Sequence, residues 1–131
     1  MSKIGVGIIG CGSIFGVHAE AVKKSGTAEL KAVADIKESA AKEAAGRYGC
    51  DFYTDYRKML KDPGIQAVHI CTPHYLHASM AIDALKAGKH VLTEKPVAVN
   101  VEDAAKMAET ARACGKHLAV CFQNRFNPTS V

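Results

Sequence analysis

Tryptophan is absent from the 131 residues, and tyrosine and phenylalanine together make up only 6% of them. Because β-sandwiches are rich in aromatic and β-branched side chains, this composition favours helices packed tightly on a sheet. No segment approaches the roughly 18 consecutive apolar residues of a membrane span, and the N-terminal M-S-K-I-G-V-G lacks the layout of a signal peptide. We therefore expect a cytoplasmic protein with no membrane partner.

The sequence also contains no run of basic residues. Its 17 lysines and arginines outnumber 13 acidic residues, for a net charge of +4, and they are scattered with few aromatic residues between them. Nucleic-acid-binding proteins gather basic side chains on one face or in one segment. We therefore expect no nucleic-acid partner.

Cysteine and histidine spacings of the kind that bind metals are missing as well. The cysteines are odd in number, contain no C-x-x-C, and lie in apolar surroundings at positions 11, 50, 71, 114 and 121. This pattern indicates buried free thiols in a reducing cytoplasm. His74 and His77 stand three residues apart, but no carboxylate or cysteine pattern joins them, so no metal site is expected.

What the sequence does contain is an alternation of short apolar segments with helix-forming segments. The apolar segments predict six strands, at 3–9, 29–34, 52–53, 66–71, 90–93 and 117–122. Helices are expected after Ser13, over 37–48, in a short turn capped by Thr54 or Asp55, over 75–87, and from Asn100 to Gly115. For the first helix, helical spacing predicts an apolar face of Ile14, Val17, Ala21 and Val22.

The alternation predicts an α/β fold. Strands that are continuously apolar and separated by helices are typical of a parallel sheet covered on both faces. Six such strands fit a doubly wound sheet, a Rossmann fold, in the order 3-2-1-4-5-6, whose ligands bind at the carboxyl ends of the strands. Two segments, Gly88–Val91 and Gly115–Leu118, each place a glycine, a lysine and a histidine before an apolar strand, so we expect two αβ units built alike.

The first strand is followed by the glycine-rich segment G-C-G-S-I-F-G. Gly10 and Gly12 match the first two glycines of a dinucleotide-binding fingerprint, and the helix beginning near Ser13 and Ile14 offers free N–H groups to a pyrophosphate. Phe15 replaces the third glycine. Because the segment lies between a first strand and a helix, we interpret it as a dinucleotide site.

Asp35 ends the second strand, where the adenosine ribose of a dinucleotide is usually bound. A carboxylate accepts hydrogen bonds from ribose hydroxyls and repels a 2′-phosphate, so NAD is favoured over NADP, although Lys37 nearby acts in the opposite direction. Asp35 as a plain turn residue before a helix is one alternative. A methyltransferase that uses S-adenosylmethionine is another, but it explains neither Thr72-Pro73 nor Glu94-Lys95-Pro96.

Two further strand ends carry candidate residues. Cys71-Thr72-Pro73 is either an ordinary turn before a helix or a wall beside the nicotinamide half of the cofactor. Lys95 follows the fifth strand, where desolvation and the charge of an oxidised nicotinamide would lower its pKa towards the ~7–8 of a general base. Glu94 would pair with Lys95 or bind a cofactor ribose. The alternative is a surface ion pair worth under ~1 kcal/mol.

Four segments together resemble the Gfo/Idh/MocA family of dehydrogenases: G-C-G-S-I-F-G-V-H, I-C-T-P-H-Y-L-H, A-L-K-A-G-K-H-V-L-T-E-K-P and F-Q-N-R-F-N-P. The resemblance implies an NAD(P)-dependent oxidoreductase that acts on a CH–OH group of a sugar, cyclitol or other polyol. It implies that the pyrophosphate is held by Gly10, Gly12, Ser13 and Ile14, and the adenosine ribose by Asp35. It further implies a cofactor groove lined by Thr72, Pro73 and His77, with Glu94, Lys95, Gln123, Asn124 and Arg125 at the nicotinamide end and Lys95 touching substrate.

Members of this family are usually more than twice this length, and a second α/β domain supplies a catalytic histidine, most of the substrate pocket and much of the oligomer interface. The resemblance therefore implies a cofactor-binding domain at 1–123, with 124–131 beginning the crossover to that second domain in a homo-oligomeric parent enzyme. We expect the chain alone to bind NAD(H) but to turn substrate over poorly. The alternative is a stand-alone, non-catalytic dinucleotide-binding module.

Overall fold

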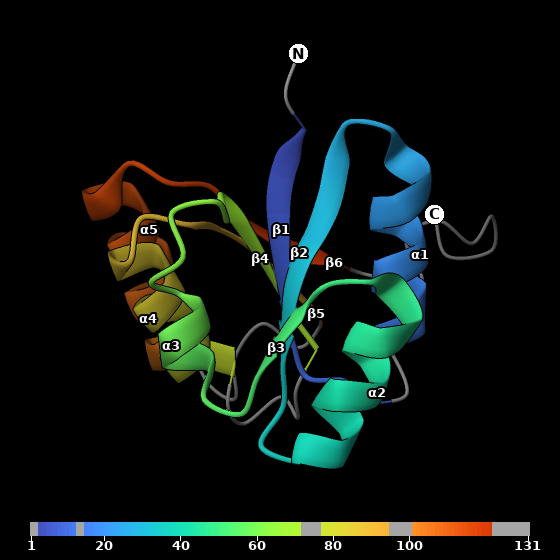
Figure 1. Ribbon diagram of the computed structural model, residues 1–131. Coiled ribbons are helices and arrows are strands. Elements are labelled where there is room, and N and C mark those ends of the chain that lie inside the picture. Colours follow the sequence, from blue (N-terminus) through green and yellow to red (C-terminus); the bar gives the residue numbers. More distant parts are fainter. Residues whose placement is uncertain (1–2, 13–14, 72–76, 95–100, 122–131) are drawn as a thin grey trace, which may run out of the picture.

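The computed structural model describes residues 3–12, 15–71, 77–94 and 101–121 and contains a single six-stranded sheet (Figure 1). The strands are β1 (Ile4–Ile9), β2 (Ala28–Ala34), β3 (Asp51–Tyr53), β4 (Ala67–Ile70), β5 (His90–Glu94) and β6 (Leu118–Cys121). Every neighbouring pair is parallel, and the strand order is β3-β2-β1-β4-β5-β6. The predicted α/β fold with a doubly wound parallel sheet is confirmed.

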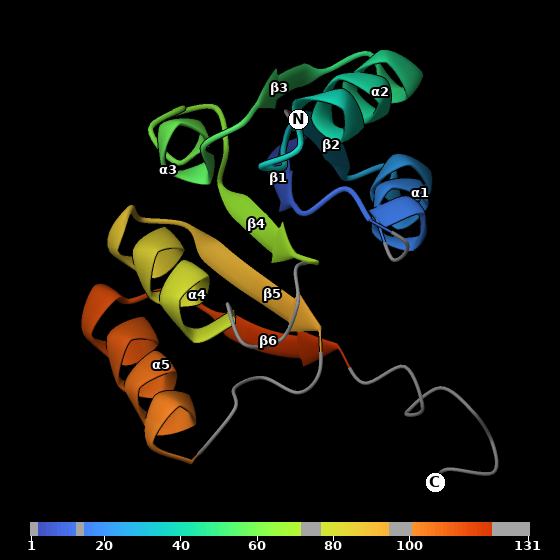
Figure 2. The same cartoon turned by 90° about the horizontal axis from the view of Figure 1, so that it is seen from below.

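Helices cover the sheet on both sides. They are α1 (Phe15–Ser25), α2 (Glu38–Tyr48), α3 (Tyr56–Met59), α4 (His77–Lys86) and α5 (Val101–Cys114). Figure 2 shows α1 and α2 on one face of the sheet and the other three helices on the opposite face. An apolar cluster of buried side chains lies on each of the two faces. None of the helices in the described segments is long and apolar enough to cross a membrane.

The buried face of α1 differs from the expected one. Val17 is 61% exposed and Ala21 is also exposed, whereas Phe15, His18, Ala19 and Val22 are buried. Of the predicted face, Val22 is buried as expected and Ile14 lies outside the described residues. The four buried positions follow helical spacing and include the polar residue His18, which hydrophobic periodicity does not predict. The burial of His18 is explained by a partner on β4, described below.

The expectation of buried thiols holds for one cysteine and is wrong for three. Cys71 is buried, whereas Cys11, Cys50 and Cys114 are only partly buried, and all four are free. Cys11 and Cys50 lie at loops that flank the apolar cluster under α1 and α2, where part of the side chain remains in contact with solvent. The side chain of Cys121 lies outside the described residues.

The two αβ units expected to be alike are alike. Gly88 and Gly115 both have positive φ, at 86° and 67°, a backbone conformation that glycine adopts without strain. The backbone N–H of the following lysine donates to Ala84 O in one unit and to Ala111 O in the other, at 3.0 Å in both. Each helix therefore ends in the same turn and returns the chain to the amino end of the next strand.

The two lysines in these turns have different environments. Lys89 is only 6% exposed, and its Nζ donates to the backbone oxygens of Asp62 at 2.8 Å and Ile65 at 2.6 Å. Burial lowers the pKa of Lys89; Asp62 opposes the shift and Lys116 adds to it. Lys116 holds the same place in the second turn but is only partly buried. Lys89 thus ties the turn after α3 to the end of α4.

We predict that Lys89→Met lowers the free energy of unfolding by about 2–3 kcal/mol, because two backbone carbonyls lose their donor in a buried position. Lys116→Met is the matched control and is expected to change stability by less than about 0.5 kcal/mol. Chemical denaturation of both variants measures the difference. Equal effects would show that the hydrogen bonds of Lys89 contribute nothing to stability.

Candidate functional site

A cleft of about 790 Å³ opens at the carboxyl edge of the sheet. Its walls come from the segments that follow β1, β2, β3 and β4, together with the first half of α4. The lining residues are Ile9, Gly10, Gly12, Ala34, Asp35, Ile36, Lys37, Thr54, Asp55, Tyr56, Arg57, Cys71, Ser79 and Met80. Three of the predicted site residues, Gly10, Gly12 and Asp35, therefore lie in one cleft.

Gly10 is required by the backbone itself. Its φ is +97°, a conformation that residues with a Cβ rarely adopt, and its N–H donates to Ala34 O at 2.7 Å. This bond turns the chain away from β1 directly above the end of β2. The tight turn expected at the first glycine is present.

Neither the backbone conformation nor the neighbouring protein atoms require a glycine at position 12. A Cβ built on it would meet no heavy atom within 4 Å, and its φ is outside the left-handed region. Because Gly12 lines the cleft, the space beside its Cα is available to a ligand. The residues present therefore fit a phosphate group that approaches the backbone closely.

The carboxylate of Asp35 joins the glycine loop to the segment before α2. Its Oδ2 accepts from Cys11 N at 2.8 Å and its Oδ1 from Lys37 N at 2.9 Å. The hydrogen bond from Lys37 N shows that Asp35 also stabilises the turn before α2, which was the alternative role considered for this residue. Since each carboxylate oxygen has two acceptor positions, both oxygens retain capacity for ribose hydroxyls.

The thiols near this loop are in their protonated form. Burial, Asp35 and Cys50 raise the pKa of Cys11 to about 12. Burial and Asp51 raise the pKa of Cys50 to about 11. A thiol is a strong nucleophile only as the thiolate, so the loop is suited to binding rather than to covalent chemistry.

Sequence reasoning missed the outer wall of the cleft. Ile36 is 92% exposed, and on the facing segment the Arg57 guanidinium lies 4.8 Å from the centre of the Tyr56 ring. The Tyr56 hydroxyl donates to Asp83 Oδ2 at 2.5 Å, and burial together with this bond raises the pKa of Tyr56. An apolar residue directly after a strand-end acid was the available signal for Ile36. No local signal indicates Tyr56, because its partner Asp83 lies on α4.

The remaining predicted site residues are not described at side-chain level. His77 is the first residue of α4 and Glu94 the last residue of β5, but the structure describes only their backbones. The others lie outside the described residues: Ser13, Ile14, Thr72, Pro73, Lys95, Gln123, Asn124 and Arg125. Among the residues that are described, no group of three or more histidine, cysteine or acidic side chains could hold a metal ion.

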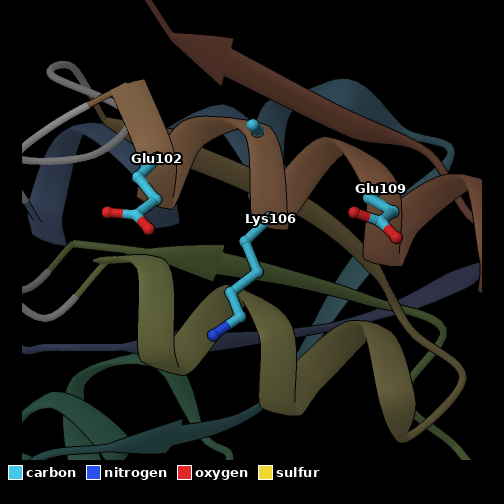
Figure 3. Close-up of a pocket in the computed structure, with 4 residues that line it drawn as sticks. Glu102, Lys106 and Glu109 are labelled. Atoms are coloured by element: carbon cyan, nitrogen blue, oxygen red, sulfur yellow. The ribbon is translucent and has the colours of Figure 1, made fainter.

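A second hollow, of about 530 Å³, lies on the outer face of α5 and is lined by Glu102, Ala105, Lys106 and Glu109. Figure 3 shows the three charged side chains leaving one helix without converging on a common point. All four residues are exposed. This is an ordinary solvated helix face, and we assign no site to it.

Comparison with known proteins agrees with this geometry. A family model described as "Oxidoreductase family, NAD-binding Rossmann fold" matches residues 4–122. The chain belongs to this family, Gfo/Idh/MocA. It is an NAD-binding Rossmann domain of the oxidoreductase type, as the resemblance implied.

Two curated relatives and one solved structure illustrate the match within Gfo/Idh/MocA. An uncharacterized oxidoreductase, YrbE, of Bacillus subtilis is 36% identical over 96% of this chain and 37% of its own length. Inositol 2-dehydrogenase of Rhizobium meliloti is 40% identical over 93% of this chain and 37% of its own length. The WlbA dehydrogenase from Bordetella pertussis, solved with NADH and UDP-GlcNAcA, superposes with a TM-score of 0.93 at 35% identity, over 98% of this chain and 39% of that one. The chain thus spans little more than a third of these proteins.

We predict that Gly12→Ala weakens NADH binding about tenfold or more, equivalent to at least ~1.4 kcal/mol, because its methyl group occupies the open space in the cleft. The same change should leave the free energy of unfolding within about 0.5 kcal/mol. Gly10→Ala, by contrast, should cost about 1–2 kcal/mol of stability because of its positive φ.

Gly16→Ala is the matched control. Gly16 lies in α1, a Cβ there would meet nothing within 4 Å, and alanine is the better helix former, so NADH affinity should not change. Calorimetric titration and chemical denaturation measure the two quantities. Full NADH affinity in Gly12→Ala would rule out close approach of a ligand to this loop.

Proposed function

We propose that this domain binds the coenzyme in an NAD(P)-dependent dehydrogenase that transfers hydride between nicotinamide and a CH–OH carbon of a sugar, cyclitol or related polyol. The observation that carries the proposal is the joint position of the open glycine loop and the Asp35 carboxylate in one cleft. The names of relatives support the substrate class, since they include an inositol 2-dehydrogenase and a D-glucoside 3-dehydrogenase.

The cleft suggests how the coenzyme is held. The pyrophosphate would lie against Gly10 and Gly12, with Ser13 and Ile14, the residues just before α1, offering backbone N–H groups. The free acceptor positions of Asp35 would bind the adenosine ribose, and the exposed side chain of Ile36 would cover one side of the adenine. When bound, the nicotinamide supplies the hydride acceptor or donor.

Lys95 is the residue that we propose for proton transfer. β5 is parallel to β4 and ends at Glu94, so Lys95 follows a strand end at the same edge as the cleft. A neutral Lys95 would take the proton from the substrate hydroxyl as hydride leaves, and Glu94 would orient it or bind a cofactor ribose. Thr72, Pro73, His77, Gln123 and Asn124 are proposed to line the nicotinamide half.

The domain organisation is also a proposal. Residues 1–123 would form the coenzyme domain, and 124–131 would begin the crossover to a second domain. The match covers only 37% of the length of these two relatives, and the rest of their chain has room for the substrate pocket and the interface of a homo-oligomer. The present chain is therefore expected to bind NADH without oxidising polyols.

We predict that NADH binds to the chain about tenfold or more tightly than NADPH, because the Asp35 carboxylate repels a 2′-phosphate. Asp35→Asn should reduce the ratio of NADH affinity to NADPH affinity while keeping a hydrogen-bond acceptor for Cys11 N. Lys37→Ala is the opposing control and should widen the ratio. Calorimetry with both coenzymes measures it. A folded chain that binds neither coenzyme would overturn the proposed function, and equal affinities would overturn the role of Asp35.

In the longest available form of the enzyme, Lys95→Ala is expected to lower kcat at least ~10²-fold, the usual effect of losing a general base. NADH affinity should remain within about twofold, since the role is proton transfer and not coenzyme binding. Lys86→Ala, at an exposed position late in α4, is the control and should leave both values unchanged. Steady-state kinetics measure kcat, and a titration with NADH measures the affinity. Unchanged turnover in Lys95→Ala would show that Lys95 is not the general base.

A further inference from the structure

A pair of histidines joins α1 to β4 beneath the cleft. Nδ1 of His18 lies 3.0 Å from Nδ1 of His69, and the two rings meet edge to face with centroids 5.1 Å apart. His18 is only 5% exposed. The surroundings are apolar, because α1 contributes Phe15 and Ala19 to the same face and Ile8 of β1 pairs with His69.

The contact between the two rings is a hydrogen bond with one shared proton. An imidazole nitrogen either donates or accepts, so one Nδ1 carries the hydrogen and the other accepts it. The bond survives in the neutral pair and in the singly protonated pair, and is lost only when both rings are charged. Burial and the neighbouring His18 lower the pKa of His69 to about 4, so the bond is intact near neutral pH.

The position of the pair connects it to the cleft. His18 lies one turn after Phe15, where α1 begins, and α1 follows the glycine loop. His69 lies one residue before the end of β4, next to Ile8 near the end of β1. The pair therefore links the first turn of α1 to the two central strands directly below the edge where the cleft opens.

A hydrogen bond constrains α1 more tightly than its apolar contacts do. Apolar burial is non-directional, so the contacts of Phe15, Ala19 and Val22 with the sheet tolerate small rotations of the helix. A hydrogen bond weakens steeply as its length and angle depart from the optimum, so even a small rotation of α1 weakens the bond between His18 and His69. The hydrogen bond between the two histidines therefore favours one rotation and one axial position of α1 over nearby rotations and positions.

We propose that His18 and His69 are positioning residues, whose hydrogen bond fixes α1 so that its N-terminal N–H groups face the pyrophosphate of the coenzyme. The inference rests on the proposed coenzyme site. It assigns a function to two residues that do not line the cleft. It also predicts that the binding affinity of ligands that contain the pyrophosphate depends on the histidine pair, whereas the affinity of ligands without a pyrophosphate does not.

The test compares His69→Leu with the double variant His18→Leu/His69→Leu. The single change leaves His18 buried without its ring partner and should lower both the melting temperature and NADH affinity. The double change removes both polar rings, so the melting temperature should recover towards that of the wild type. NADH affinity should remain about tenfold or more below wild type, because only apolar contacts then orient α1.

Three further measurements sharpen the comparison. Adenosine, which has no phosphate, should bind all variants within about twofold of wild type. His69→Asn, whose amide places a donor or acceptor as many bonds from the backbone as Nδ1, should bind NADH more tightly than His69→Leu. His117→Leu is the matched control, since His117 is exposed and stacks on His90 at the amino ends of β5 and β6, and it should leave NADH affinity unchanged.

Each outcome is decisive. Wild-type NADH affinity in the double variant would overturn the positioning role, and so would a parallel loss of adenosine and NADH binding. If His69→Leu does not fold, the double variant and His69→Asn still give the comparison. A folded wild-type chain that binds no NADH would overturn the proposed coenzyme site and the positioning role with it, whereas NADH binding that is insensitive to the pair would overturn the positioning role alone.

Discussion

The register of β1 between its two neighbours is the constraint on which the cleft depends. Ile9 pairs with Ala34 on β2 and with Ile70 on β4, so these three strands end level. The residue that follows a strand then donates to the last residue of the neighbouring strand. Gly10 N, after β1, donates to Ala34 O of β2, and Cys71 N, after β4, donates to Ile9 O of β1. A shift of one residue would exchange the two faces of a strand and separate these ends. The glycine turn and the acid can face each other only in this register.

Four polar side chains lie within otherwise apolar layers, and three of them join separate parts of the fold. Lys89 binds two backbone carbonyls and joins the end of α4 to the turn after α3. His18 and His69 join α1 to β4. Thr93, fully buried on β5 one residue before Glu94, has no hydrogen-bond partner for its Oγ1 in the part of the chain that the structure describes. The directional hydrogen bonds of Lys89 and of the histidine pair specify a single arrangement where apolar packing permits several.

Local patterns were enough to predict the elements of the fold, because strands and helix ends have local causes. The apolar runs mark the strands, and the glycines at 49, 88 and 115 take the positive φ that ends a helix. The face of α1 could not be read in the same way, since His18 is buried against a partner 51 residues away. Lys89 and Lys116 follow the same local pattern, and only the nearby turn carbonyls explain why one is buried. Tyr56 likewise depends on Asp83, 27 residues further along the chain.

The described cleft is chemically suited to holding a ligand and poorly suited to moving protons. Both oxygens of Asp35 accept backbone N–H groups, which fix the position of its side chain. The pKa of Cys11 and that of Tyr56 are both raised, so the thiol and the phenol keep their protons near neutral pH. A hydride transfer between an alcohol and nicotinamide also requires a base for the hydroxyl proton. In the proposed function that base is Lys95, which follows the end of β5 at the same edge of the sheet as the cleft.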